Sequence, residues 1–220
     1  MTIEAVIFDF DGLLMDTEGT MVASWQYEWR QHGLELDLAA FLADHGGDLT
    51  QERYGDLARA VGPGYDRPAS HARRMAYRNT LNSQLGLLPG IGAWLDEAVR
   101  LGLRLAVASS SPRSWVGGML DRSGYRDRFE TIACGDEVAA PKPDPAVYLL
   151  ALTRLGVPAS AAVAIEDAPH GVAAARAAGL RCVAIPGVFG DLARFADADL
   201  VLASAADRDL PGLLRELASR

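Results

Sequence analysis

The chain of 220 residues is half hydrophobic and carries a net charge of −8, with 29 acidic residues against 21 basic ones. This length and apolar content suit one core domain with an insertion, or two small domains, around a sizeable buried core. The acidic balance argues against nucleic acid as a partner, so an anionic substrate would have to be met by local positive charge.

The composition also bears on location. No apolar run reaches membrane-spanning length, and Glu4 and Asp9 interrupt the start of the chain too early for a signal peptide. Cys134 and Cys182 lie in apolar segments, so we expect two buried free thiols in a reducing compartment. We therefore expect a cytoplasmic protein without membrane partners. We also expect a monomer.

Short apolar runs alternate along the chain with helical patterns. The sequence predicts strands over residues 5–10, 103–109, 131–134, 162–165, 181–185 and 200–202. It predicts helices over residues 91–101, 112–123, 145–155, 169–178 and 208–218, with Asp144 as an N-cap before Pro145. Strands that are apolar almost throughout are typical of parallel sheets covered on both faces. We expect an α/β fold with a Rossmann-like parallel sheet core and helices on both faces.

Residues 17–86 interrupt this alternation, because they contain helical patterns and no convincing strand. Helices are expected over 17–32, 38–44, 50–61 and 68–85. The stripe from Met21 to Trp29 has the spacing of one helix face and indicates a small core of its own. We expect an inserted α-helical cap domain over 17–86 and a core domain over 1–16 and 87–220.

The first predicted strand ends in two alternating carboxylates, Asp9 and Asp11, followed by Gly12. Side chains two positions apart in a strand lie on the same side, and glycine permits a sharp turn. Two ionised carboxylates ~5 Å apart repel by about 3 kcal/mol at an effective dielectric near 20. A metal ion, or one protonated carboxyl, would remove this cost, whereas the alternative is a strand followed by an ordinary Asp-Gly turn.

Lys142 is the single lysine among 21 basic residues. A bias toward arginine explains the others and leaves Lys142 as the exception. A compact ammonium fits between a phosphate oxygen and a carboxylate where a planar guanidinium would not. Pro141 and Pro143 stiffen the chain on both sides of it. We expect Lys142 in a loop at a strand end, outside the core, where its replacement changes stability little.

Two further strand ends carry polar residues. Ser109, Ser110 and Ser111 open a helix, and helix N-termini favour anions, although Ser111 before Pro112 also has the form of an ordinary N-cap. Glu166 and Asp167 follow another apolar run; alone they could be an acid pair favoured by a helix dipole.

Ligands of open α/β sheets bind beyond the carboxyl ends of the strands, so all these groups are expected to converge. Four converging carboxylates require a cation, and hard oxygen ligands point to Mg²⁺. Other motifs do not fit: no glycine stands directly before Lys142 as in a Walker loop, and the histidines and cysteines have no zinc spacing.

The order of these motifs resembles the haloacid dehalogenase superfamily of phosphohydrolases, in particular the β-phosphoglucomutase-like subgroup. The matching segments are residues 9–18, 108–111, 141–143 and 165–167. The insertion over residues 17–86 sits where that subgroup carries its helical cap.

The resemblance implies roles for the matching residues. Asp9 would be the nucleophile that forms an aspartyl-phosphate, and Asp11 would protonate the leaving oxygen and then activate water. The residues implied to hold the phosphoryl group are Gly12, Ser109, Ser110 and Lys142. The metal ligands implied for Mg²⁺ are Asp9, the main-chain carbonyl of Asp11, Asp167 and, through water, Glu166.

The insertion departs from the mutase pattern of this subgroup. Met21 aligns with the histidine that sugar-phosphate mutases carry, and their cap arginine would fall near Leu49 and Thr50, in the loop at 46–48, where this chain has none. Dehalogenases and phosphonatases would lack the acid that Asp11 supplies. The resemblance thus favours a Mg²⁺-dependent phosphomonoesterase acting on a small phosphorylated metabolite, a sugar or polyol phosphate. A sugar-phosphate mutase is the first alternative and a non-catalytic phospho-ligand binder the second.

The last predicted helix of the insertion carries Arg73, Arg74 and Arg78. We expect these residues either to attract an anionic substrate or to form a solvated basic face.

Overall fold

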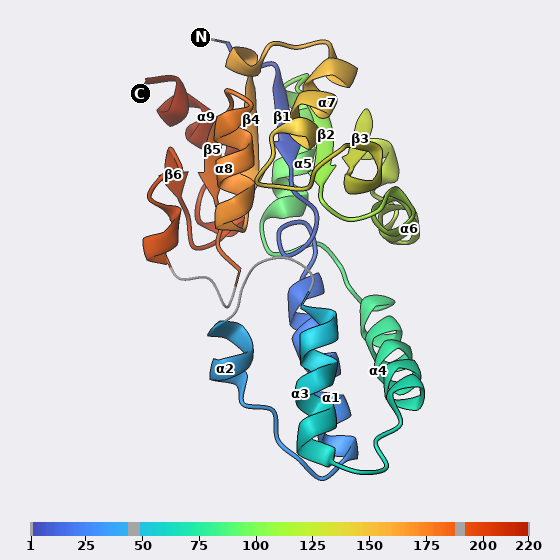
Figure 1. The fold of residues 1–220 in the computed structure, drawn as a ribbon. Coiled ribbons are helices and arrows are strands. Elements are labelled where there is room, and N and C mark those ends of the chain that lie inside the picture. The colour runs from blue at the N-terminus through green and yellow to red at the C-terminus, as the bar shows by residue number, and fades with distance from the viewer. Residues whose placement is uncertain (1, 44–48, 188–191, 220) are drawn as a thin grey trace. The chain divides into compact units, whose positions relative to one another are not determined.

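A computed structural model describes residues 2–43, 49–187 and 192–219 of the chain (Figure 1). The chain divides into two compact units. The first, the sheet unit, consists of Met1–Asp16 and Leu85–Arg220, and the second, the helical unit, consists of Thr17–Gln84.

The sheet unit is built on parallel strands, of which the described residues form six, in the order β3-β2-β1-β4-β5-β6. The strands are β1 Ala5–Phe8, β2 Arg104–Ser109, β3 Thr131–Cys134, β4 Ala162–Glu166, β5 Arg181–Ala184 and β6 Leu200–Val201. Ile7 of β1 pairs with Ala106 of β2 and with Ala164 of β4, so β1 lies between β2 and β4 in the sheet. The prediction of a Rossmann-like parallel sheet is confirmed.

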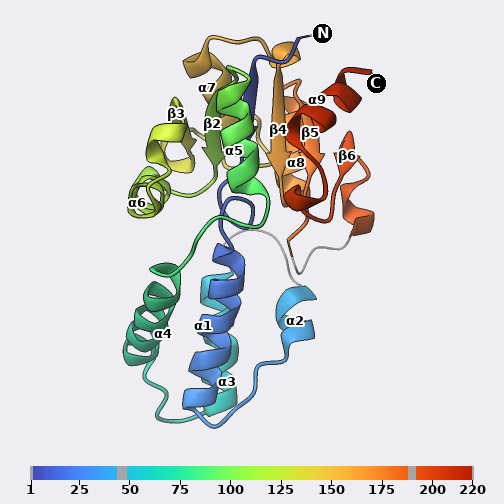
Figure 2. The same cartoon turned by 180° about the vertical axis from the view of Figure 1, so that it is seen from behind.

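Helices cover both faces of this sheet (Figures 1 and 2). They are α5 Ile91–Arg100, α6 Arg113–Ser123, α7 Ala146–Leu155, α8 Pro169–Ala177 and α9 Leu210–Ser219. Short 3₁₀ turns occur at Arg126–Arg128, Gly135–Glu137, Ala159–Ala161, Leu192–Phe195 and Ala205–Asp207. Val6 and Phe8 face the core shared with α5, α6 and α9, whereas Ala5 and Ile7 face the core under α7 and α8. This alternation is the reason that the strands are apolar on both faces.

The main differences from the predicted elements lie at their ends. Strand β1 ends at Phe8, two residues earlier than expected, because the chain then turns at Gly12, whose φ is +81°. Helix α7 begins at Ala146 with Pro145 as its N-cap, so the expected N-cap is one residue too early. Asp144 Oδ1 nevertheless accepts a hydrogen bond from the Ala146 N–H at 2.9 Å.

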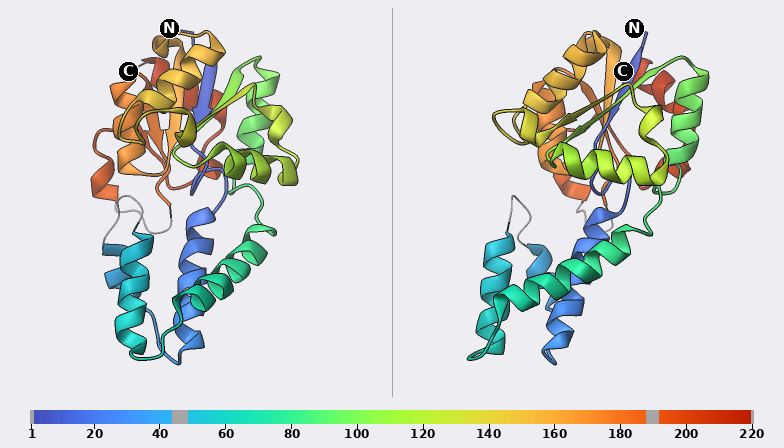
Figure 3. Two further views of the ribbon diagram at one scale, coloured as in Figure 1. Left: turned by 45° about the vertical axis from the view of Figure 1, so that its right-hand side comes forward. Right: turned by 90° about the vertical axis from the view of Figure 1, so that its right-hand side faces the viewer.

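The helical unit contains α1 Thr17–Gln31, α2 Leu38–Ala43, α3 Thr50–Val61 and α4 Arg67–Asn82 (Figure 3). Helices α1 and α4 pack against each other. Trp25, Tyr54 and Leu57 form a buried cluster, and Met21 and Trp29 pack against it. The prediction that the Met21-to-Trp29 stripe is a packing surface is therefore confirmed.

The three arginines of α4 that the sequence analysis named, Arg73, Arg74 and Arg78, have different surroundings. The Arg74 side chain lies inside the helical unit: the residue is 3% exposed, and its guanidinium lies 4.2 Å from the centre of the Trp25 ring. Arg73 forms an ion pair with Glu28 at 2.6 Å, and Arg78 contacts the Thr17 carbonyl oxygen at 3.5 Å. The expectation of a substrate-facing or solvated arginine is wrong for Arg74, because its charge is satisfied by aromatic rings and hydroxyl groups.

Cys134 and Cys182 are buried and free, as predicted. Burial raises the pKa of the Cys134 thiol to about 12, which keeps it protonated near neutral pH. Across the described ranges, the structure contains no helix with the length and apolar character needed to span a membrane.

Candidate active site

Three neighbouring strands end in polar residues at the same edge of the sheet. Ser109 is the last residue of β2, Asp9 directly follows β1, and Glu166 is the last residue of β4. The Asp9 N–H donates to the Ile165 carbonyl at 2.9 Å, so the backbone ladder with β4 extends one residue past the strand. All three side chains are buried. The strand order therefore brings together groups that lie far apart in the sequence.

Lys142 lies at the centre of this arrangement. Its Nζ donates to Asp9 Oδ1 at 2.5 Å, to Glu166 Oε1 at 2.6 Å and to the Ala108 carbonyl oxygen at 2.8 Å. These contacts engage all three donors of the ammonium group. The Lys142 side chain is only 2% exposed, so the expectation that it lies outside the core is wrong. The loop carries it inward because two carboxylates stabilise its charge there.

Glu166 is held from two sides by residues that the sequence did not single out. The Tyr148 hydroxyl of α7 donates to Glu166 Oε1 at 2.5 Å, the oxygen that also contacts Lys142. A Cβ added to Gly171, in the first turn of α8, would lie 2.0 Å from Glu166 Oε2. Only glycine fits there while the carboxylate keeps this position. A glycine two residues after a helix start carries no recognisable signal, which is why sequence reasoning missed it.

The acids of the site form a candidate metal cluster. One carboxylate oxygen each from Asp9, Glu166 and Asp167 lies within 4.8 Å of the others, and all three residues are buried. Lys142 pairs with two of these acids, Asp9 and Glu166, so one ammonium stands against three clustered carboxyl groups in a buried space. An all-oxygen donor set of this charge fits Mg²⁺. The Asp11 carboxylate is not part of this cluster.

Burial and the neighbouring charges together set the charge states of Asp9 and Lys142. Burial raises the pKa of Asp9 from 3.8 to about 8, with Glu166 adding to the increase and Lys142 opposing it. For Lys142 burial acts against the charge, but the carboxylates of Asp9 and Glu166 outweigh it and raise its pKa. The ammonium is therefore permanently charged, whereas the Asp9 carboxyl requires a further positive charge to ionise fully near neutral pH.

Asp11 is held by residues of the β2–α6 segment. Ser111 Oγ donates to Asp11 Oδ2 at 2.6 Å, and Ser109 Oγ lies 3.4 Å from the same oxygen. The Trp115 indole N–H donates to Asp11 Oδ1 at 3.0 Å. Helix α6 has Pro112 as its N-cap, so the alternative in which Ser111 caps this helix is wrong. Trp115 is also a residue that the sequence analysis did not identify, because a tryptophan in a first helical turn usually indicates packing.

The remaining predicted phosphate-binding groups lie in two turns. Ser110 Oγ accepts a hydrogen bond from the Lys142 N–H at 3.3 Å, and the Gly12 N–H donates to the Met15 carbonyl oxygen at 2.9 Å. The turn formed by Ser109, Ser110 and Ser111, here called the serine turn, packs closely against Gly135: a Cβ added to Gly135 would lie 2.1 Å from the Ser110 carbonyl oxygen. The turn is thus fixed in place, while the phosphate contacts of Gly12 and Ser110 stay predictions.

Within the helical unit, the position expected for a mutase histidine is occupied by Met21. An Arg53 nitrogen lies 3.4 Å from Met21 Sδ, and its guanidinium stacks on Phe41 at 3.9 Å from the ring centre. The loop at 46–48, in which the mutase arginine was sought, lies outside the described residues.

Comparisons with known proteins show what the chain is similar to. The family model of haloacid dehalogenase-like hydrolases matches residues 6–185. The chain is 36% identical over 219 residues to the putative phosphatase YhcW of Bacillus subtilis, and the match covers 99% of both chains.

Solved structures show the same architecture. CbbY from Rhodobacter sphaeroides in complex with phosphate has a TM-score of 0.74 and 34% identity, covering 96% of this chain and 99% of that one. A second structure of CbbY from that organism contains xylulose-(1,5)bisphosphate. A putative β-phosphoglucomutase from Thermotoga maritima has a TM-score of 0.83 and 28% identity, with 98% and 100% coverage.

Proposed function

Because this chain belongs to the haloacid dehalogenase-like hydrolase family, in its β-phosphoglucomutase-like subgroup, we propose that it is a Mg²⁺-dependent phosphomonoesterase of a small sugar or polyol phosphate. Family membership and the phosphatase relatives establish the coarser statement, that it is a phosphatase of this superfamily acting on phosphorylated substrates. The proposal adds the metal, the covalent intermediate and the substrate class. The helical unit would serve as the cap over the substrate.

One observation carries the proposal: the buried Asp9 carboxylate lies 2.5 Å from Lys142 and beside Glu166 and Asp167. Phosphoryl transfer needs a positioned nucleophile and positive charge around the phosphoryl oxygens, and little other covalent chemistry. Lys142 supplies a fixed charge beside the nucleophile. Ser109, Ser110 and Gly12 are proposed to contact the phosphoryl group from the adjoining turns.

In the proposed first step, an Asp9 carboxylate oxygen attacks phosphorus and the bond from phosphorus to the substrate oxygen breaks. Asp11 gives its proton to that oxygen, which leaves as an alcohol. In the second step a water oxygen attacks the aspartyl-phosphate, the bond between phosphorus and the Asp9 oxygen breaks, and Asp11 takes the proton from water. Inorganic phosphate leaves, and both aspartates return to their starting forms.

The residues present fit Mg²⁺, which would be held by Asp9, Asp167, the Asp11 main-chain carbonyl and, through water, Glu166. When bound, the ion supplies charge neutralisation at the phosphoryl oxygens. Its positive charge would also oppose the effect of burial, which is the main cause of the raised pKa of Asp9. A monomeric state and a cytoplasmic location stay predictions.

A sugar-phosphate mutase is the second candidate, and the likeness to a putative β-phosphoglucomutase supports it. Such an enzyme returns the phosphoryl group to a sugar rather than to water. Met21, in place of the expected histidine, favours hydrolysis.

The test is a panel of phosphorylated sugars and polyols incubated with the protein and Mg²⁺, followed for inorganic phosphate and for isomerised sugar phosphate. Accumulation of free phosphate supports the phosphomonoesterase. Isomerisation without free phosphate, dependent on a catalytic amount of bisphosphate, identifies a mutase instead. Neither product from any substrate would contradict both.

A further inference from the structure

The Asp11 carboxylate has different hydrogen-bond partners at its two oxygens. Oδ1 accepts from the Trp115 indole N–H at 3.0 Å, and Oδ2 accepts from the Ser111 hydroxyl at 2.6 Å. An indole N–H can only donate, whereas a hydroxyl group can donate or accept. The oxygen facing Trp115 must therefore stay an acceptor, and the oxygen facing Ser111 can carry a proton without losing its contact.

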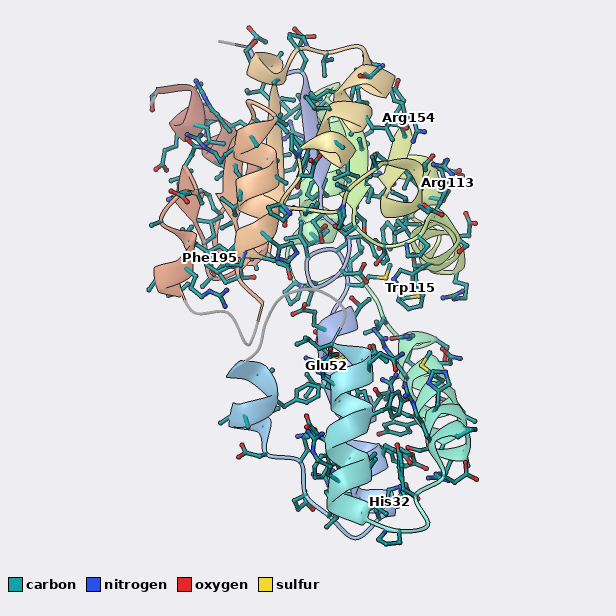
Figure 4. The ribbon with its side chains drawn as sticks, viewed as in Figure 1. His32, Glu52, Arg113, Trp115, Arg154 and Phe195 are labelled. Carbon is teal, nitrogen blue, oxygen red and sulfur yellow. The ribbon has the colours of Figure 1, made fainter. Side chains whose placement is uncertain are left out.

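The two partners are fixed relative to each other by the fold. Trp115 lies in the first turn of α6, directly after the serine turn (Figure 4). The Arg113 N–H at the start of α6 donates to Asp136 Oδ1 at 3.0 Å, and the Gly135 N–H donates to the Ser111 carbonyl oxygen at 3.1 Å. The 3₁₀ turn after β3 thus holds both the helix start and the serine turn. The Trp115 indole and the Ser111 hydroxyl therefore hold the two oxygens of the Asp11 carboxylate from fixed positions.

We propose that Trp115 is a positioning residue of the acid–base step: its indole N–H turns the Asp11 carboxyl so that Oδ2 carries the proton to the leaving oxygen and takes the proton from water. This inference rests on the proposed function, because it uses the acid–base role of Asp11. Trp115 itself touches no reacting atom. Its contribution is the orientation of a group whose proton must lie in line with the breaking bond, where a misplacement of about 1 Å can cost ~10²-fold in rate.

The experiment compares Trp115→Phe with the wild-type protein on two aryl phosphates of similar shape. Para-nitrophenyl phosphate has a leaving group that needs little protonation, and phenyl phosphate has a much more basic one. Release of the aryl alcohol is followed by rapid mixing during the first turnover, which separates this step from hydrolysis of the phosphoenzyme. We expect the first-turnover rate on phenyl phosphate to fall at least about tenfold, and the rate on para-nitrophenyl phosphate to change much less. We expect KM to be nearly unchanged.

Two sets of controls separate orientation from structure. Trp94→Phe removes another hydrogen-bonded indole, that of the buried Trp94, whose N–H donates to the Arg208 carbonyl oxygen at 2.8 Å, and it should leave the ratio of the two rates unchanged. Ser111→Ala should reproduce the selective loss on phenyl phosphate, and Ser111→Thr, which keeps the hydroxyl, should restore the wild-type ratio. Melting curves verify that each variant is folded.

Equal slowing on both substrates in folded Trp115→Phe would overturn the inference, because it indicates a structural role alone. A faster first turnover would also overturn it, since the indole would then hold Asp11 in a resting position. If the wild-type protein releases no aryl alcohol here and no free phosphate from the panel of phosphorylated sugars and polyols, the proposed function fails, and this inference fails with it. If it hydrolyses a member of that panel but neither aryl phosphate, the same comparison is made with that substrate, where the first-turnover rate should fall in Trp115→Phe and not in Trp94→Phe. An active wild-type protein with an unaltered rate ratio in Trp115→Phe overturns the inference alone.

Discussion

Lys142 Nζ lies 2.5 Å from Asp9 Oδ1, although the two residues are separated by 133 positions in the chain. The same ammonium contacts Glu166 at 2.6 Å. One positive group therefore links a residue after β1 to a residue at the end of β4. Several measurable properties of the protein depend on this link.

The first prediction concerns the shape of Lys142. Lys142→Arg keeps the charge and Lys142→Ala removes it, but we expect both to lower kcat by about 10²-fold or more, because a planar guanidinium would displace Asp9 or the phosphoryl group. Since the residue is buried between carboxylates, Lys142→Ala should also lower the free energy of unfolding by roughly 3–5 kcal/mol. Steady-state kinetics and urea unfolding provide the two measurements. A kcat of Lys142→Arg near the wild-type value would mean that charge alone suffices.

The second prediction concerns the two aspartates. Asp9→Ala should form no phosphoenzyme, because the attacking oxygen is missing. Asp11→Asn should still be phosphorylated by para-nitrophenyl phosphate, whose leaving group needs little protonation, but should hydrolyse the aspartyl-phosphate about 10²-fold or more slowly. Acid quenching followed by mass spectrometry measures the phosphoenzyme. Phosphate trapped on Asp9→Ala would contradict this division of roles.

The third prediction concerns the metal. Activity should disappear with excess chelator and return with Mg²⁺. Asp167→Ala should abolish turnover and binding of Mg²⁺, because a direct ligand is removed. Glu166→Gln should lower the affinity for Mg²⁺ by a smaller factor, because Glu166 would act through water. The matched control is Glu130→Gln, which alters an exposed carboxylate paired with Arg104, far from the cluster in sequence. Calorimetric titration with Mg²⁺ measures the affinity directly. Full activity in chelator, or an unaltered Asp167→Ala, would rule out the assignment.

The fourth prediction concerns pH and stability without metal. The Asp9 pKa is raised from 3.8 to about 8 by burial, so folding takes up a proton between these values, and the stability of the metal-free protein should fall as the pH rises through this range. Lys142, whose pKa is raised above 10.5, loses its contribution only at higher pH. Melting temperatures measured in chelator should decrease across the window, and Asp9→Asn should flatten the curve. A wild-type melting temperature that rises with pH, unaffected by Asp9→Asn, would show that Asp9 is ionised without metal.

The fifth prediction concerns the interior of the helical unit. Arg74 donates to the Tyr54 hydroxyl at 2.8 Å and stacks on Trp25, so Arg74→Ala should lower the free energy of unfolding of this unit by about 2–4 kcal/mol. The control is Arg59→Ala, which breaks an exposed pair with Asp56 and should cost about 0–1 kcal/mol. Urea unfolding of the full chain gives both values. If Arg74→Ala lowered the free energy of unfolding as little as Arg59→Ala does, Arg74 would be exposed to solvent and the prediction would be wrong.

The sequence was sufficient to predict the sheet and the groups at its edge. Apolar runs between helical patterns indicate parallel strands, because a strand covered on both faces must be apolar on both. Asp9, Ser109 and Glu166 could be found because each ends such a run, and parallel strands end at one edge. These are local signals, readable from neighbouring residues.

Only the tertiary structure decided how these groups are held. The burial of Lys142 depends on two carboxylates at the ends of β1 and β4, strands that are neighbours in the sheet but far apart in the sequence. The contacts of Tyr148 and Trp115 depend on how α7 and α6 pack. Gly171 is required by the space that the Glu166 side chain occupies. Hydrogen-bond partners and close contacts between residues far apart in the sequence depend on their positions in space. The pattern of residue types along the chain does not show which residues will meet.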